Sequence, residues 1–167
     1  KKVVVKIGNG GRKIGNPLQE FLDLVDGVAV TSPISTGAIP ASNQRCMFVG
    51  GSKGSICGNF VMENADLLVA IGTRFVCQSD CSRTGYPAVE TVINLNTDLN
   101  DATHYNNTIV LLGDANLSLQ HLNEVLKARP PKVPEGMSEW FGSCLEKRRE
   151  WQALKTSRMA HPALFDP

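Results

Sequence analysis

The sequence lacks a surplus of charge of either sign. Its 167 residues contain 17 Lys and Arg against 16 Asp and Glu, so the formal net charge is +1. Aromatic residues make up only 6% of the chain, and they are not interleaved with a basic stripe. Nucleic acids and acidic membrane surfaces are bound through basic patches, so we expect neither as a partner.

Long apolar runs and paired cysteines are also missing. No segment approaches the roughly 20 apolar residues of a membrane-spanning helix, and no secretory signal peptide is present. The cysteines are odd in number, contain no C-x-x-C pair and therefore argue against a disulfide framework or a zinc site. We expect buried reduced thiols and a cytoplasmic protein. The five cysteines are Cys46, Cys57, Cys77, Cys81 and Cys144.

Motifs of the common enzyme classes are absent as well. There is no P-loop and no G-x-S-x-G nucleophile elbow. His104, His121 and His161 are isolated, and we expect the first two at the surface. Asp98 and Asp101 are expected to act in a turn or as helix caps. The sequence therefore predicts no catalytic residue and no metal ligand in this chain.

A dinucleotide fingerprint is begun but not completed. Gly8 and Gly10 follow an apolar strand, yet Lys13 stands where G-x-G-x-x-G needs its third glycine. No acidic residue ends the second strand, where it would bind a ribose. The sequence therefore argues against an ordinary dinucleotide dehydrogenase.

What the sequence does contain is a regular alternation of strands and helices. Helices are predicted from Asn16, as an N-cap followed by Pro17, from near Ile56, and after Asp114 as a cap. The alternation implies right-handed crossovers and predicts a three-layer, Rossmann-like α/β domain, with a mostly parallel sheet flanked by helices. The predicted strands are Val3–Ile7, Val28–Thr31, Leu67–Ile71, Thr91–Leu95 and Thr108–Leu112.

Glycine-rich loops follow several of these strands at their carboxyl ends, where ligands bind in open α/β sheets. The segment from Gly50 to Phe75 is the centre of the pattern. Gly51, Lys53 and Gly54 precede the helix that begins near Ile56, so backbone and helix N–H groups can approach an anion there. A tight turn without a ligand is the alternative for these glycines.

The end of the chain differs in composition. Residues 129–134 form a proline-rich, stiff segment, and Trp140, Cys144, Trp151 and Leu154 fall on one face of a last helix. The charged run 146–150 is expected to be the solvated side of that helix. Because the chain opens with Lys1 and immediately begins a strand, we expect a piece of a longer protein.

Six motifs in order carry a resemblance to a known family. The chain resembles the central domain of thiamine-diphosphate-dependent enzymes of the acetolactate synthase type, over about Lys2 to Leu126. A narrower similarity, in Gly72–Phe75, Cys81–Thr84 and Ile93–Asn96, is to the trihydroxycyclohexanedione hydrolases. Acetolactate synthases usually carry aspartate and proline where Asn96 and Leu99 stand here. The motifs are VVVKIGNGG, TGAIPASNQ, GSKGS, ADLLVAIGTRF, INLNTD and LLGD.

The resemblance implies a three-domain parent that forms a homodimer or homotetramer. Thiamine diphosphate and Mg²⁺ would lie between the N- and C-terminal domains, which are absent here. Residues 1–128 would be the central Rossmann-like domain, and 129–167 a linker, helix and tail that lead to a cofactor-binding domain. Gly113-Asp114-Ala115 looks like a fragment of the family's Gly-Asp-Gly motif, but we interpret it as a strand-to-helix turn.

The central domain of some family members holds FAD or an adenine nucleotide. The resemblance carries that site over to Gly8, Gly10, Gly51, Lys53, Gly54, Gly72, Arg74, Asp98 and Asp114. Arg74 is suited to a bidentate pair with phosphate; its alternative partner is a carboxylate of an absent domain.

Three functions remain open from the sequence. The first is an inactive middle domain of a thiamine-diphosphate enzyme that acts on 2-oxo acids or a cyclic dione. The second is a free-standing NAD- or FAD-binding Rossmann-like module. The third is a structural domain with a vestigial pocket.

Overall fold

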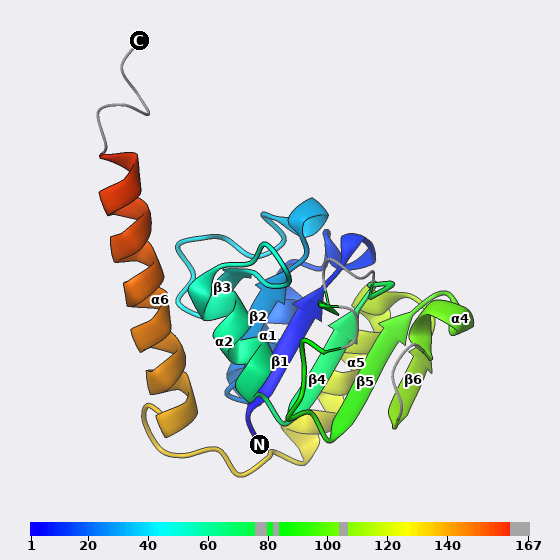
Figure 1. Cartoon of the computed structure of the whole chain (residues 1–167). Coiled ribbons are helices and arrows are strands. Elements are labelled where there is room, and N and C mark those ends of the chain that lie inside the picture. The colour runs from blue at the N-terminus through cyan, green and yellow to red at the C-terminus, as the bar shows by residue number, and fades with distance from the viewer. Residues whose placement is uncertain (76–79, 82–83, 104–106, 161–167) are drawn as a thin grey trace.

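The computed structural model describes residues 1–75, 80–81, 84–103 and 107–160. Its centre is a six-stranded sheet with the order β3-β2-β1-β4-β5-β6, and every strand pair is parallel (Figure 1). This is the doubly wound order of nucleotide-binding α/β folds. The strands are β1 (Val3–Ile7), β2 (Val28–Thr31), β3 (Cys46–Val49), β4 (Leu67–Ile71), β5 (Thr91–Asn96) and β6 (Thr108–Leu112).

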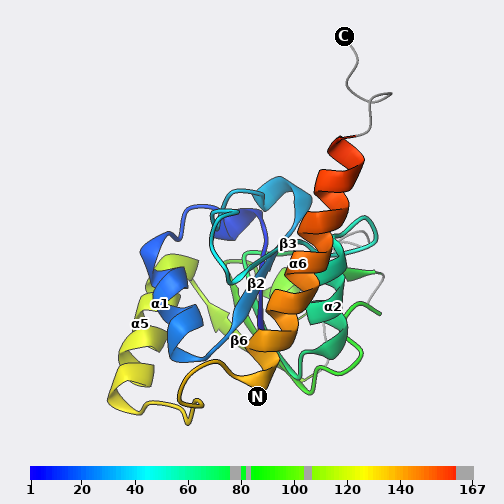
Figure 2. The same ribbon diagram turned by 90° about the vertical axis from the view of Figure 1, so that its left-hand side faces the viewer.

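Helices cover both faces of the sheet and complete three layers (Figure 2). Two 3₁₀ turns, η1 (Asn9–Gly11) and η2 (Pro33–Ser35), follow β1 and β2. The predicted three-layer, Rossmann-like α/β fold is thus confirmed. The helices are α1 (Asn16–Leu24), α2 (Ile56–Asn64), α4 (Leu99–Ala102), α5 (Ala115–Ala128) and α6 (Glu139–Met159).

The strand pattern explains the two cores. Val3, Val5 and Ile7 point to the face covered by α1 and α5, whereas Val4 points to the face covered by α2 and α6. Side chains alternate between faces in a strand, so one buried apolar run serves both cores. None of the helices in the described part of the chain combines the length and apolar character that crossing a membrane requires.

The five predicted strands are confirmed, but β3 was missed. It has only four residues, and its pairing with β2 shifts register between Ala29 and Thr31. Phe48 has a φ of 60° in this bulge, a backbone conformation that bulky residues rarely adopt. An interrupted strand of this length gives no clear period-2 signal.

Two local predictions need correction. The first helix begins at Asn16 with Pro17 in its first turn, but Gly15, with φ of 64°, takes the N-cap position without a side-chain cap. The second correction concerns the charged run 146–150 in α6. Arg148 is only 8% exposed, because α6 packs with this side against α2 and the segment before β3.

Arg148 is buried because backbone carbonyls satisfy its guanidinium. Its Nε donates to Cys46 O at 3.0 Å, and its second terminal nitrogen donates to Ala41 O and Asn43 O at 2.6 and 3.2 Å. The guanidinium also lies 5.2 Å from the centre of the Phe48 ring. A buried charge needs such partners to be tolerated, and sequence periodicity cannot reveal them.

Three of the described cysteines, Cys46, Cys57 and Cys144, are buried free thiols as expected, and the fourth, Cys81, is free but only half-buried. Burial raises the pKa of all three buried thiols, which keeps them protonated and inert. Cys77, His104 and His161 lie outside the described residues, whereas His121 is exposed as predicted.

Candidate functional site

The strand order fixes where a ligand can enter. β1 and β4 lie side by side at the centre, and the chain leaves them toward opposite sides of the sheet. Loops that part in this way leave a crevice beyond the carboxyl ends of the two strands. The glycine-containing turns after β1, β3, β4 and β6 all lie at this edge, because all six strands are parallel.

Three of the predicted glycines form the floor of this crevice. Gly8 N donates to Ile71 O at 2.8 Å, and Gly10 N donates to Gly72 O at 3.0 Å. A Cβ on Gly8 would lie 2.3 Å from Gly72 O, and one on Gly72 would lie 2.5 Å from the Cα of Gly10. The loops after β1 and β4 therefore pack backbone against backbone, and these glycines serve that packing first.

A cleft of about 270 Å³ lies above this floor, between the loops after β1, β4, β5 and β6. It brings together four of the predicted residues, Gly10, Gly72, Arg74 and Asp114. Gly8 lies directly beneath, in contact with Gly72 and Thr73. The structure thus gathers five of the nine predicted positions at one place.

The acidic residues near the cleft have defined local roles. Asp114 caps α5 by accepting a hydrogen bond from Leu117 N at 2.9 Å, which confirms the predicted strand-to-helix turn. Asp98 caps α4 by accepting from Asn100 N at 2.8 Å, and it lies outside the cleft lining. Asp101 lines the cleft instead.

The sequence reading missed several lining residues. Asn9, Asn96 and Thr97 lie beside Arg74 in the cleft. Asn96 is the last residue of β5, and its Nδ2 donates to Thr73 O at 3.0 Å, which holds the loop after β4 in place. Its position at a strand end was the available signal, because every strand end in a parallel sheet reaches the same edge.

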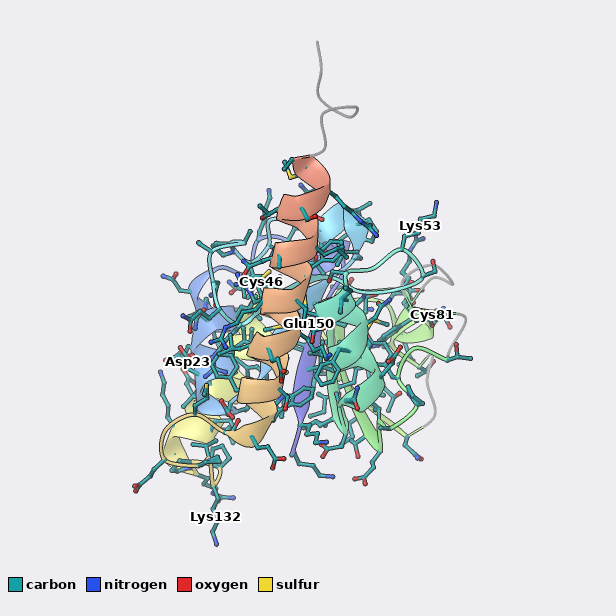
Figure 3. The ribbon with its side chains drawn as sticks, turned by 60° about the vertical axis from the view of Figure 1, so that its left-hand side comes forward. Asp23, Cys46, Lys53, Cys81, Lys132 and Glu150 are labelled. Atoms are coloured by element: carbon teal, nitrogen blue, oxygen red, sulfur yellow. The ribbon has the colours of Figure 1, made fainter. Side chains whose placement is uncertain are left out.

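The remaining predicted residues, Gly51, Lys53 and Gly54, form a separate turn. Gly54 N donates to Gly51 O at 2.8 Å, and Gly51 N donates to Asn59 Oδ1 at 2.9 Å. The turn follows β3, which β2 separates from β1, and it does not line the cleft. Lys53 is exposed and projects outward from the molecule (Figure 3).

One charged side chain connects the turn to the centre of the sheet. Lys6 in β1 is fully buried, and its Nζ donates to Gly50 O at 3.0 Å. Burial lowers the pKa of Lys6 to about 8, while Cys81 and Asp80 partly counteract the shift. The ammonium group thus anchors the start of the turn from within the sheet.

The cleft can be tested against a nucleotide. Its lining contains one guanidinium, that of Arg74, and two carboxylates, those of Asp101 and Asp114. A guanidinium suits phosphate, and carboxylates suit ribose hydroxyls. The cleft lies just below the roughly 300–1,000 Å³ of typical ligand sites, so these residues fit the ribose-phosphate part of a nucleotide better than a whole dinucleotide.

The described residues show no comparable site for a metal ion. No three His, Cys, Asp or Glu side chains among them are placed to hold one. Asp114, in the fragment that looks like the family's Gly-Asp-Gly motif, accepts the hydrogen bond from Leu117 N that begins α5.

A doubly wound parallel sheet with a polar crevice at its switch point defines a nucleotide-binding type of α/β domain. Residues 1–122 match the family model described as thiamine pyrophosphate enzyme, central domain. The chain belongs to this family of central domains.

Curated relatives agree with the family match. The chain is 28% identical to the acetolactate synthase isozyme 3 large subunit of Escherichia coli, over 93% of this chain and 28% of that protein. It is 26% identical to the chloroplastic acetolactate synthase of Arabidopsis thaliana, over 99% of this chain and 25% of that protein. Acetolactate synthase 1 of Nicotiana tabacum is 25% identical over 99% of this chain and 23% of its own length. The chain spans about a quarter of the length of these relatives.

Proposed function

We propose that this chain is the middle domain of a thiamine-diphosphate-dependent enzyme that acts on a 2-oxo acid, as an acetolactate synthase does, or on a cyclic dione. Thiamine diphosphate, when bound with Mg²⁺, supplies the carbon nucleophile of such reactions. In this proposal both are held by the N- and C-terminal domains of a dimeric or tetrameric cytoplasmic parent. Residues 1–128 are the central unit and 129–167 the connection onward, and the chain itself provides no catalytic residue.

The domain's own task is to bind a nucleotide, FAD or an adenine nucleotide, in the cleft at the switch point. The single observation that carries this proposal is that Arg74, Asp101 and Asp114 line one cleft together with the glycines of its floor. Arg74 binds a phosphate oxygen pair, and a carboxylate accepts from a ribose hydroxyl. The rest of a larger nucleotide extends along the same edge toward Gly51, Lys53 and Gly54.

Calorimetry with FAD, ADP, NAD and coenzyme A tests the nucleotide site on the chain as it is. We expect binding of FAD or ADP, and a loss of at least tenfold in affinity for Arg74→Ala, because a charge-assisted bidentate contact is lost. Arg129→Ala is the matched control, since Arg129 is exposed just after α5 and outside the cleft. Equal affinity of wild type and Arg74→Ala contradicts the proposed site.

Two further measurements separate this proposal from its rivals. Turnover of pyruvate by the isolated chain with thiamine diphosphate and Mg²⁺ would contradict the assignment of catalysis to other domains. Submillimolar NAD binding by the chain would favour the free-standing NAD-binding module. A well-folded chain that binds none of the four ligands would favour a structural domain.

A further inference from the structure

Asn96 connects the loops that surround the cleft. It is the last residue of β5, which lies between β4 and β6 in the sheet (Figure 1). Its Nδ2 donates to Thr73 O at 3.0 Å, in the loop after β4. Its backbone oxygen accepts from Gly113 N at 2.8 Å, in the loop after β6. One residue therefore holds the loops on both sides of its own strand.

The side-chain oxygen of Asn96 organises the loop after β5 as well. Oδ1 accepts from Thr97 N at 2.9 Å and from Asp98 N at 3.2 Å. Asn96 is only 7% exposed, so water does not readily replace these partners. An amide fits this position because it combines a donor and an acceptor, whereas a carboxylate only accepts and would place an oxygen against Thr73 O.

The loop that Asn96 holds carries the cation of the cleft. Arg74 is exposed, whereas Thr73 and Phe75 on either side of it are 5% and 1% exposed. Gly72 and Phe75 have φ values of 54° and 48°, and a bulky residue keeps such a conformation only where its surroundings hold it. The hydrogen bond from Asn96 to Thr73 O is thus a fixed point directly before Arg74.

The neutral amide also decides the charge balance of the cleft. The lining contains one guanidinium, that of Arg74, and the carboxylates of Asp101 and Asp114. A third carboxylate at position 96 would lie among the same loops and would repel an anionic ligand, in a site partly shielded from water. With the amide in place, one fewer negative charge opposes a phosphate group that binds Arg74.

We propose that Asn96 is the positioning residue of this cleft: its amide holds the loop that carries Arg74 and makes the cleft select a ligand that bears phosphate over an uncharged one. The inference rests on the nucleotide site proposed above and adds the residue that sets the charge selectivity of that site. Asn96 acts through Arg74, which binds the phosphate.

Calorimetry with ADP and with adenosine tests this role on wild type and on Asn96→Asp, a substitution that keeps the shape of the side chain. We expect wild type to bind ADP more tightly than adenosine. The substitution should lower the affinity for ADP by about tenfold or more and change that for adenosine little, because it removes a buried donor and adds a charge. The ratio of the two affinities is the readout, since a general loss of structure would weaken both ligands together.

Asn94→Asp is the matched control. Asn94 is 1% exposed in the same strand, its Nδ2 donates to Ala102 O at 3.1 Å in α4, and it does not line the cleft. The same chemical change there should lower the urea midpoint and leave the ratio of affinities unchanged. Asn96→Ala removes the contact to Thr73 without adding charge, and it should lower the ratio by less than Asn96→Asp does.

Hydrogen exchange followed by nuclear magnetic resonance gives a second readout, part of which needs no variant. In wild type we expect the side-chain amide hydrogens of Asn96 to exchange more slowly than those of Gln152, which is exposed. In both Asn96 variants the backbone amides of residues 73–75 should exchange faster than in wild type, because their loop has lost its contact.

Two results overturn the proposal. One is an Asn96 side-chain amide that exchanges as fast as that of Gln152. The other is a set of Asn96 variants that leave the ratio of affinities and the exchange of residues 73–75 unchanged. A wild type that binds neither ADP nor adenosine contradicts the nucleotide site instead, and the exchange rates then still decide whether Asn96 holds the loop.

Discussion

Lys6 is a charged residue in the middle of an otherwise apolar central strand. The register of β1 places it between Val30 and Ala70, with its side chain on the face that α2 covers. Full burial lowers its pKa to about 8, and Asp80 and Cys81 act in the opposite direction. Its hydrogen bond to Gly50 O compensates only part of the cost of desolvation.

The first prediction at this scale concerns pH. An unfolded chain keeps the ordinary Lys pKa of 10.5, so between pH 8 and 10.5 it binds more protons than the native state, and the free energy of unfolding rises with pH. The gain from Lys6 is at most about 3 kcal/mol, at 1.36 kcal/mol per pKa unit. Chemical denaturation of wild type and Lys6→Met at several pH values measures it.

The measured quantity is the difference in the free energy of unfolding between wild type and Lys6→Met. This difference is needed because the buried thiols titrate in the same pH range and lower the stability of both proteins as the pH rises. Cys46, Cys57 and Cys144 have raised pKa values, so they lower stability as the unfolded thiols ionise. Lys53→Met is the control, since Lys53 is exposed. If the difference in the free energy of unfolding between wild type and Lys6→Met stays constant from pH 8 to 10, the pKa of Lys6 is not lowered by burial.

At the scale of elements, aromatic and cationic side chains hold α6 against the rest of the domain. In some pairs α6 contributes the aromatic ring, and in another it contributes the cation. Trp140 stacks on Phe60 with ring centres 6.2 Å apart. Arg45 lies 4.5 Å from the ring centre of Phe141, and Arg148 lies 5.2 Å from that of Phe48. Contacts in both directions fix the helix more firmly than a single apolar stripe would, and they make α6 part of the folded unit.

Arg148→Ala should lower the free energy of unfolding by about 2–4 kcal/mol, because three backbone carbonyls lose their donor in a buried site. Arg149→Ala is the matched control, because Arg149 is exposed, and the change in the free energy of unfolding should stay within about 0.5 kcal/mol. Urea titrations followed by circular dichroism measure both. Equal losses for the two variants would show that the Arg148 contacts contribute nothing.

At the scale of the whole molecule, one sheet separates two cores, and α6 closes the one on the α2 face. That core contains Cys57 and Met62 from α2 together with Trp140 and Cys144 from α6. The helix is therefore expected to unfold together with the sheet rather than before it. The molecule has two tryptophans, Trp140 and Trp151, and both lie on α6.

Tryptophan emission therefore reports on α6 alone, whereas far-ultraviolet circular dichroism reports on all helices. We expect the two signals to give the same denaturation midpoint in urea, since a single cooperative transition is the norm for a domain of this size. An emission change at lower urea than the ellipticity change would mean that α6 detaches first, as a separate linker helix would.

Most of the fold could be predicted from the sequence, because apolar runs, helix caps and glycines indicate the same strands, helices and turns along the chain. The run Leu67–Ile71 predicted a strand covered on both faces, and the structure has it at the centre of the sheet. Asp114 was predicted as a helix cap and is one. β3 escaped prediction because its bulge at Phe48 breaks the alternation, and Asn16 was mistaken for the cap because Gly15 reaches a positive φ without any side-chain signal.

The sequence by itself determined the layered α/β fold and the membership in a family of central domains, because local patterns and ordered motifs are properties of the chain read in one direction. Only the tertiary structure decided which residues meet. It brought Arg74, Asp101 and Asp114 around one cleft and left the Gly51–Gly54 turn outside it. It also buried Arg148, because burial depends on which segments pack beside a residue in space.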